Sequence, residues 1–201
     1  MIMLKIQNKH LNKNIESYQY CYGQDFLEEK QAKDILNWLK TANWDLTVAD
    51  FYTQYEFMLN IKNTDKDLHY LFSKETLNYL KDFMKNLFNV DFKDNCYVVA
   101  HKLIDGHYID IHNDYLENEP DVETHRLIIQ FNDGWAKSFG GLLKTFNSDN
   151  KSDIKDIFIP NHNSVFAFEI SPYSYHAVSP IHNATRYTLI YNFTKLVTYE
   201  N

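Results

Sequence analysis

The sequence predicts a mainly β protein with α-helical support, arranged as a sandwich or jelly roll. Three observations lead to this fold class. Short apolar, β-branched runs follow one another from about residue 95, turn-forming clusters separate them, and two amphipathic stretches with helical spacing come before them. Eight short strands punctuated by turns are typical of such folds, and the helices would then brace one sheet.

Composition supports one domain with a full core. The chain has 201 residues, of which 44% are hydrophobic and 16% aromatic, and its 5 Gly and 4 Pro leave no flexible linker. The net charge is −7, and all but two of the 20 cations are lysines scattered along the chain. This pattern gives no basic footprint for nucleic acid or acidic lipid, so neither partner is expected.

Several class signals are absent from the sequence. Cys21 and Cys96 make neither a disulfide framework nor a zinc ribbon. The apolar start is too short for a signal peptide, and no run approaches the roughly 18 apolar residues of a membrane span. We therefore expect a cytoplasmic protein, in a reducing setting where a bound iron would stay ferrous.

We expect one domain over residues 1–201, with residues 1–95 giving helical support and N-terminal strands. Asp25 is expected to cap a first helix, with Glu28 in the capping-box position. A second helix is expected over residues 74–88. Both apolar stripes are interpreted as core packing. Between the helices, Asp50–Asp65 is aromatic and then polar, and could form strands, a lid or both.

Residues 96–198 are expected to form the β core. The expected strands are Tyr97–Leu103, Tyr108–Ile111, Leu127–Phe131, Gly141–Phe146, Ile157–Ile159, Val165–Phe168, Tyr175–Val178 and Tyr187–Phe193.

A candidate metal-binding triad lies in this region. His112 and Asp114 form a His-x-Asp sequence, and in an extended segment both would point to one face. His176 would join them from a distant strand. Two imidazoles and one carboxylate are the ligand set of non-haem Fe(II) oxygenases, with open positions for a chelating 2-oxo acid and for O₂. His-x-Asp alone arises by chance, so its value lies in the combination with His176 and Arg186.

The remaining histidines show no matching constellation and are interpreted as ordinary surface or core residues. They are His10, His69, His101, His107, His125, His162 and His182.

Arg186 follows His176 by ten positions and opens an alternating strand. Its side chain would share a face with Thr188, and a guanidinium matches a carboxylate bidentately. The ordinary alternative is a surface salt bridge. An arginine on an apolar strand, in a chain that otherwise uses lysine, favours a binding role.

The stretch from Gly106 to Phe193 resembles the Fe(II)- and 2-oxoglutarate-dependent oxygenases, in the prolyl-hydroxylase-like branch. Six pieces match in order along a little under half of the chain. They are Gly106-His-Tyr-Ile-Asp-Ile-His112-Asn-Asp114, Arg126-Leu-Ile-Ile-Gln-Phe-Asn-Asp-Gly-Trp135, Gly140-Gly141-Leu-Leu, Asn163-Ser-Val-Phe-Ala-Phe168, His176-Ala-Val-Ser-Pro and Ala184-Thr-Arg186-Tyr-Thr-Leu.

The resemblance implies a double-stranded β-helix (jelly roll) in which His112, Asp114 and His176 bind Fe(II). Arg186 would bind the 5-carboxylate of 2-oxoglutarate. Gln130 stands where close relatives often carry a tyrosine, and we expect it to donate a hydrogen bond to the co-substrate. The tyrosine that often precedes the first motif is not evident near His101, and no role is carried over to Arg126.

The expected activity is 2-oxoglutarate-dependent hydroxylation of an unactivated C–H bond, with release of succinate and CO₂. Asp114 favours hydroxylation because halogenating relatives carry a small residue there; desaturation and cyclisation stay open. The substrate would be a peptidyl residue, such as proline, or a free amino acid or natural product. The rival hypothesis is a non-catalytic jelly-roll module that binds a partner.

Substrate contacts are expected in Asp50–Asp65 and Asp110–Glu123. Tyr108 and Asp110 precede His112 by four and two residues, so a regular strand would place them on its face. An aromatic ring and a carboxylate beside the iron would suit a substrate with an apolar body and a cationic group. Core packing of Tyr108 is the alternative.

Overall fold

Twelve strands form one sheet in the computed structural model, which describes residues 3–119 and 122–197. They are β1 (Asn12–Asn14), β2 (Tyr20–Gly23), β3 (Asp45–Ala49), β4 (Tyr52–Met58), β5 (Tyr97–Leu103), β6 (Ile109–His112), β7 (His125–Gln130), β8 (Leu143–Phe146), β9 (Ile154–Phe158), β10 (Ser164–Glu169), β11 (His176–Val178) and β12 (Arg186–Phe193).

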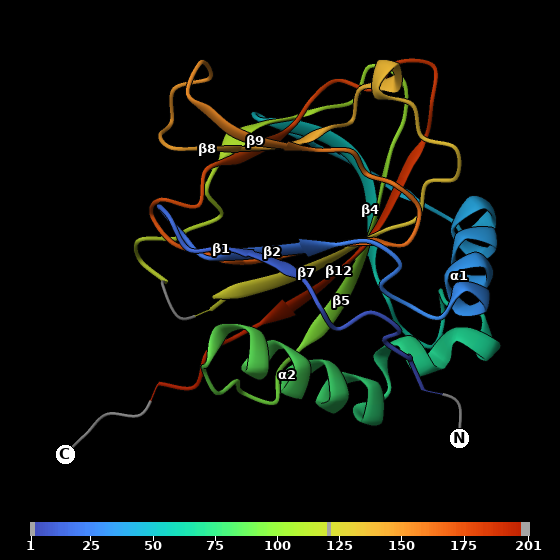
Figure 1. Ribbon diagram of the computed structural model, residues 1–201. Coiled ribbons are helices and arrows are strands. Elements are labelled where there is room, and N and C mark those ends of the chain that lie inside the picture. The colour runs from blue at the N-terminus through green and yellow to red at the C-terminus, as the bar shows by residue number, and fades with distance from the viewer. Residues whose placement is uncertain (1–2, 120–121, 198–201) are drawn as a thin grey trace.

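The sheet curls into two facing layers, which is the jelly roll that the sequence predicts (Figure 1). Its strand order is β1-β2-β10-β7-β12-β5-β4-β6-β11-β8-β9, and β3 pairs with β4. All the pairs are antiparallel, and strand β4 links the layers by pairing with β5 at one end and with β6 at Tyr52. Strands from both parts of the chain therefore build one continuous sheet.

Helices α1 (Glu29–Thr41) and α2 (Lys74–Phe88) cover the outer face of the layer that contains β5, β12 and β7 (Figure 1). Two 3-10 segments, Lys66–Phe72 and Lys137–Phe139, complete the helical elements of the described chain. None of these helices is long and apolar enough to cross a membrane.

Side-chain alternation along the central strands separates two cores. On β12, Leu189, Tyr191 and Phe193 face the helices, whereas Ile190 faces the space between the layers. Strand β7 repeats the pattern, because Leu127 and Ile129 join the helix-side core. The period of two in a strand explains this division. Burying each large apolar side chain contributes about 1.5–3 kcal/mol.

The predicted elements are largely confirmed. Helix α2 spans the expected residues, and its N-cap Ser73 accepts a hydrogen bond from the Thr76 amide. The region Asp50–Asp65 contributes β4, which forms a hairpin with β3. Strands β1 to β3, outside the expected β core, were not individually predicted. Strand β1 is polar, and β2 joins the sheet through its long-range pairing with β10.

The expected capping role of Asp25 is wrong. Helix α1 begins at Glu29, its N-cap Glu28 makes no side-chain capping bond, and Asp25 has a left-handed φ of 53°. Asn163 holds the intervening segment extended, since its Oδ1 accepts from the Leu27 amide and its Nδ2 donates to the Leu27 carbonyl. This tertiary contact outweighs the local capping signal.

Buried His125 should make the fold sensitive to acid. It packs between Phe88 and Phe92, and burial lowers its pKa to about 3. In the unfolded chain this histidine binds a proton near pH 6.5. Its contribution to stability is therefore fully present above that pH and is lost as the pH falls toward 3. His125→Leu should reduce the slope of unfolding free energy against pH by about 1.4 kcal/mol per pH unit between pH 6 and 4. Urea unfolding across this range measures the slope, and an unchanged slope would contradict the expectation.

Candidate active site

The structure brings His112, Asp114 and His176 together between the two layers. His112 ends β6 and lies directly opposite His176 on β11. Asp114 is not in an extended strand, as the sequence suggested, but follows β6 with a left-handed φ of 61°. One candidate ligand atom from each residue lies within 4.8 Å of the others. The turn after β6 therefore brings Asp114 beside the two histidines, as a regular strand was expected to do.

The hydrogen bonds of the two imidazoles prepare them as metal ligands. His112 Nδ1 lies 2.8 Å from the Asp110 carbonyl, and His176 Nδ1 lies 2.7 Å from the Ser174 carbonyl. A carbonyl can only accept, so Nδ1 carries the proton in both rings and Nε2 presents a lone pair. Burial lowers the pKa of His176, which favours the neutral ring.

With each ring neutral and protonated at Nδ1, three acceptor atoms would converge. The Nε2 atoms of His112 and His176 lie 3.5 and 3.2 Å from the carboxylate oxygens of Asp114. Lone pairs facing one another at these distances repel, and a cation placed among them would remove the repulsion. The donor set of two imidazoles and one carboxylate fits Fe(II).

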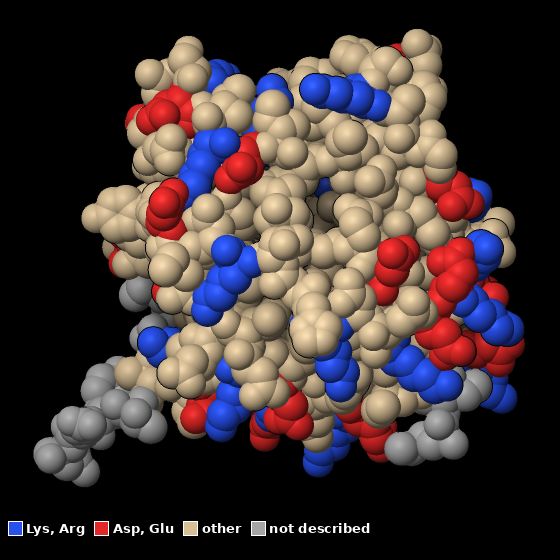
Figure 2. Space-filling view, viewed as in Figure 1, with Lys and Arg blue, Asp and Glu red and all other residues tan. Residues whose placement is uncertain are grey.

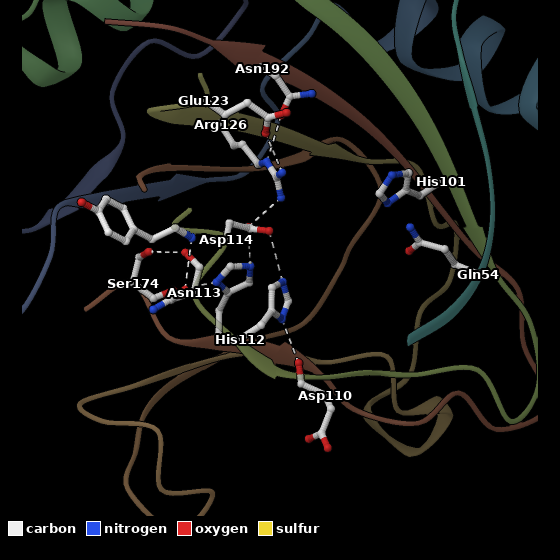
Figure 3. Close-up of polar contacts among 12 residues, drawn as sticks. Gln54, His101, Asp110, His112, Asn113, Asp114, Glu123, Arg126, Ser174 and Asn192 are labelled. Atoms are coloured by element: carbon white, nitrogen blue, oxygen red, sulfur yellow. Dashed lines mark hydrogen bonds and ion pairs between the residues drawn. The ribbon is translucent and has the colours of Figure 1, made fainter. Parts of the chain in front are cut away.

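Arg126 holds the Asp114 carboxylate from behind (Figure 3). Its Nη1 donates to Asp114 Oδ2 at 2.6 Å, its Nη2 to Glu123 Oε2 at 2.7 Å and its Nε to Asn192 Oδ1 at 2.9 Å. Burial alone would raise the pKa of Asp114, but the guanidinium holds it well below its usual range. Asp114 is therefore ionised and fixed in orientation.

The turn that carries Asp114 is fixed by its neighbours. Asn113 Oδ1 accepts from the Tyr115 amide, and Asn113 Nδ2 donates to the Pro172 carbonyl. Ser174, which is fully buried, donates its hydroxyl to the Asn113 carbonyl. These contacts join the turn after β6 to the segment before β11, so the histidine-bearing segments are held together.

A cavity of about 590 Å³ opens beside the triad, and Figure 2 shows a hollow in the face of the molecule shown. Strand register arranges its wall in rows. One row is polar, with Glu56, His101 and Thr188 on adjacent strands. The next is apolar, with Met58, Val99 and Ile190. Further lining residues include Phe51, Tyr52, Ile109, Ile128, Leu143, Val178, Arg186 and Asn192.

Arg186 lines this cavity as a buried cation without a counter-ion. It is 3% exposed, and in the described part of the chain its side chain forms no ion pair or hydrogen bond. Burial lowers its pKa to about 10, so it stays charged at neutral pH. An isolated buried charge is costly. The arrangement calls for an anion from outside the chain.

The stem of Arg186 is packed against a glycine. A Cβ built on Gly141 would lie 2.4 Å from Ile181 Cδ1, 2.9 Å from Trp135 and 3.3 Å from Arg186 Cδ, and its φ is 61°. Only glycine fits this conformation and this space without strain. The paired glycines therefore allow the close approach that places Arg186.

Of the two other residues expected to contact the co-substrate, Thr188 lines the cavity and Gln130 does not. Thr188 lines the cavity next to Arg186, and its hydroxyl donates to Gln130 Oε1 at 3.1 Å. Gln130 is buried and lies outside the lining of this cavity. Its contact with a co-substrate stays a prediction.

The expectation that Tyr108 and Asp110 share the face of His112 is wrong. A β-bulge separates the pairs His176–His112 and Val178–Ile109, so the alternation changes and Ile109 faces the cavity. Asp110 points away from the triad and pairs with Lys151 at 2.6 Å (Figure 3). Tyr108 is exposed. The substrate contact predicted for these two residues loses its geometric basis.

Several cavity residues lacked a usable signal in the sequence. Arg126 lies on β7 three residues after its partner Glu123, but Asn192 becomes its neighbour only through the register of β7 and β12. His101 was interpreted as an ordinary histidine. It faces the cavity opposite Thr188, and burial lowers its pKa to about 3.

Comparison with known proteins agrees with this geometry. Residues 98–193 match the family described as the 2OG-Fe(II) oxygenase superfamily. The chain is 26% identical over 168 residues to a curated protein of Xenopus laevis, prolyl 3-hydroxylase OGFOD1. That alignment covers 82% of this chain and 31% of the relative, so the chain spans about a third of the relative's length.

Solved structures show the same fold. A Pseudomonas putida prolyl-4-hydroxylase matches with a TM-score of 0.73 and 14% identity, covering 89% of this chain and 94% of that one. A Trichoplax adhaerens prolyl hydroxylase, solved with a hypoxia inducible factor peptide fragment, matches with a TM-score of 0.66 and 15% identity over 87% of this chain and 83% of that one. Residues 98–193 of the chain therefore match the 2OG-Fe(II) oxygenase superfamily, and its fold is one that solved prolyl hydroxylases share.

Proposed function

We propose that this protein is an Fe(II)- and 2-oxoglutarate-dependent dioxygenase that hydroxylates an unactivated C–H bond. The observation that carries the proposal is Arg186, a buried cation without a partner in the described chain, in the same cavity as the His112–Asp114–His176 triad. A metal ligand set and an anion site in one cavity match a co-substrate that chelates the metal at one end and carries a second carboxylate.

Each residue has a distinct role in this proposal. His112, Asp114 and His176 would hold Fe(II), and Arg186 with Thr188 would bind the 5-carboxylate of 2-oxoglutarate. Bound Fe(II), 2-oxoglutarate and O₂ supply the oxidising power for C–H hydroxylation, with succinate and CO₂ as co-products. The chain would orient the reactants, and the apolar side chains of Val99 and Ile190 would limit water beside them.

Asp114 favours oxygen insertion over halogenation. Its carboxylate, fixed by Arg126, would take the coordination position that a halide needs. The non-catalytic alternative explains neither the three converging acceptors nor the uncompensated Arg186, because a binding module gains nothing from a strained, repulsive set of ligands.

The substrate that the relatives favour is a prolyl residue of a peptide. The proteins compared are named prolyl hydroxylases, and one was solved with a peptide. A free amino acid or natural product is the alternative. We retain the predicted single domain and the cytoplasmic setting as part of this proposal; Cys21 and Cys96 are both free thiols.

Removing a histidine of the triad should abolish stoichiometric metal binding. His112→Ala and His176→Ala should each weaken Fe(II) binding. The loss in affinity should exceed the roughly ten- to hundredfold loss that follows removal of a hydrogen-bond partner of a metal ligand. Anaerobic calorimetric titration measures this, with exposed His182→Ala as the matched control. Asp114→Ala leaves Arg126 facing the vacated position and should bind a chloride ion beside the metal. Unaltered affinity in both histidine variants would remove the assignment.

Arg186→Lys should weaken 2-oxoglutarate binding although the charge is kept, because the planar fork is lost. The loss of a charge-assisted bidentate contact should cost about 1.5–3 kcal/mol, or roughly ten- to a hundredfold in affinity. Titration of Mn(II)-loaded protein with 2-oxoglutarate measures the effect. Thr188→Val, which removes one neutral hydrogen bond, should weaken binding less. If Arg186→Ala binds as tightly as the parent, the anion site lies elsewhere.

The product should carry one new oxygen atom. Incubation with Fe(II), 2-oxoglutarate, ¹⁸O₂ and a panel of prolyl peptides and free amino acids should give succinate and a labelled hydroxylated product. Mass spectrometry reads both. A chlorinated product, or one with two hydrogens fewer and no new oxygen, would contradict hydroxylation; no turnover of any panel member together with no 2-oxoglutarate binding would contradict the proposed function.

A further inference from the structure

The cavity wall formed by β4 carries two acceptor side chains that the proposed reaction does not use. Gln54 and Glu56 both line the cavity that contains the triad. They belong to the segment Asp50–Asp65, where substrate contacts were expected. Figure 3 shows Gln54 and His101 across the cavity from the labelled triad residues.

The orientation of the Gln54 amide follows from its partner. Its Nε2 donates to Glu56 Oε2 at 2.6 Å, and a carboxylate can only accept, so the amide cannot be reversed. Gln54 is 4% exposed, and its Oε1 is buried without a hydrogen-bond donor in the described chain. A buried acceptor of this kind requires a donor from outside the chain.

Glu56 adds an uncompensated negative charge to the same place. Its ionisable neighbour, His101 Nε2, lies 3.5 Å from Glu56 Oε2. Burial lowers the pKa of His101 to about 3, so this ring is neutral near pH 7. Lys102 lies on the other face of β5, over the rings of Trp44 and Tyr55. Within the described residues, no lysine or arginine pairs with Glu56.

The position of Glu56 separates it from the anion site. It pairs with His101, which pairs in turn with Thr188 beside Arg186. Two strand spacings, or roughly 10 Å, therefore lie between Glu56 and Thr188. A dicarboxylate bound at Arg186 would be repelled by Glu56. A second molecule, bearing donors and a positive charge, would satisfy both acceptors.

We propose that Gln54 and Glu56 form a specificity subsite for the cationic head group of a basic side chain, lysine or arginine, in the substrate. This inference rests on the proposed function, because it names the substrate class of the same cavity. The ammonium or guanidinium group would donate to Gln54 Oε1 and pair with Glu56, while the adjoining part of the substrate lies beside the triad.

The test uses matched probes that differ in charge. Arginine is compared with citrulline and lysine with norleucine, as free amino acids and as acetyl-prolyl-X-amide dipeptides, by calorimetric titration at millimolar concentrations. The two formats distinguish a free amino acid from a peptide as the source of the cation. Each titration is run on protein alone and on protein loaded with Mn(II) and 2-oxoglutarate.

In the parent protein, at least one basic probe should bind roughly tenfold or more tightly than its neutral partner, as expected for a charge-assisted contact. Glu56→Gln should remove this preference, and Gln54→Met should weaken the basic probe. Glu75→Gln, on the exposed face of α2, is the matched control and should leave the preference intact. Circular dichroism melting checks that the variants fold.

Equal binding of basic and neutral probes, or a preference that survives in Glu56→Gln, would overturn the subsite. Undetectable binding of every basic probe would overturn it as well. Failure of Mn(II) and 2-oxoglutarate to bind would contradict the proposed function instead, and the titrations on protein alone would still decide the subsite.

Discussion

A sheet buried on both faces is the constraint on which this structure depends. Strands β5, β12 and β7 lie between the helices and the interior of the roll, so every second side chain must pack against α1 and α2. Leu189 and Tyr191 meet that demand on β12. The intervening positions, Arg186, Thr188 and Ile190, are then free to line a cavity. Because side chains alternate along a strand, one set of residues on β12 packs against the helices and the other set lines the cavity.

The two arginines of the chain show how charge is handled inside that cavity. Arg126 is compensated by Asp114 and Glu123, and breaking such a buried pair would cost about 3–5 kcal/mol. Arg186 is more deeply buried, at 3% exposed, and has no such partner in the described chain. The absence of a Cβ at Gly141 leaves the space in which the side chain of Arg186 lies. One arginine pairs with Asp114 in the turn after β6, and we propose that the other binds an anion.

Local patterns in the sequence predicted the helices and most strands of the β core, whereas the exact positions of side chains in the site depend on long-range contacts. The stripe from Leu77 to Phe88 is readable because a helix has a fixed period, and α2 matches it. The triad was readable because its residue types are rare in combination. The bulge in β6 and the left-handed Asp114 were not, because each depends on contacts with β11 and Ser174. Asp110, expected in the site, is therefore outside it.

The same reasoning explains why the sequence predicted substrate contacts in Asp50–Asp65 but did not single out the two acceptors of β4. Nothing in the local sequence of Gln54 or Glu56 distinguishes a cavity residue from a solvated one. Their position follows from the pairing of Glu56 with His101 and of Tyr52 with Ile109, which places β4 between the layers. With Arg186 near one end of the polar row and Glu56 at the other, the cavity has opposite charges on opposite sides. Under our two proposals, this arrangement would orient two different molecules at once, an anionic one toward Arg186 and a cationic one toward Glu56.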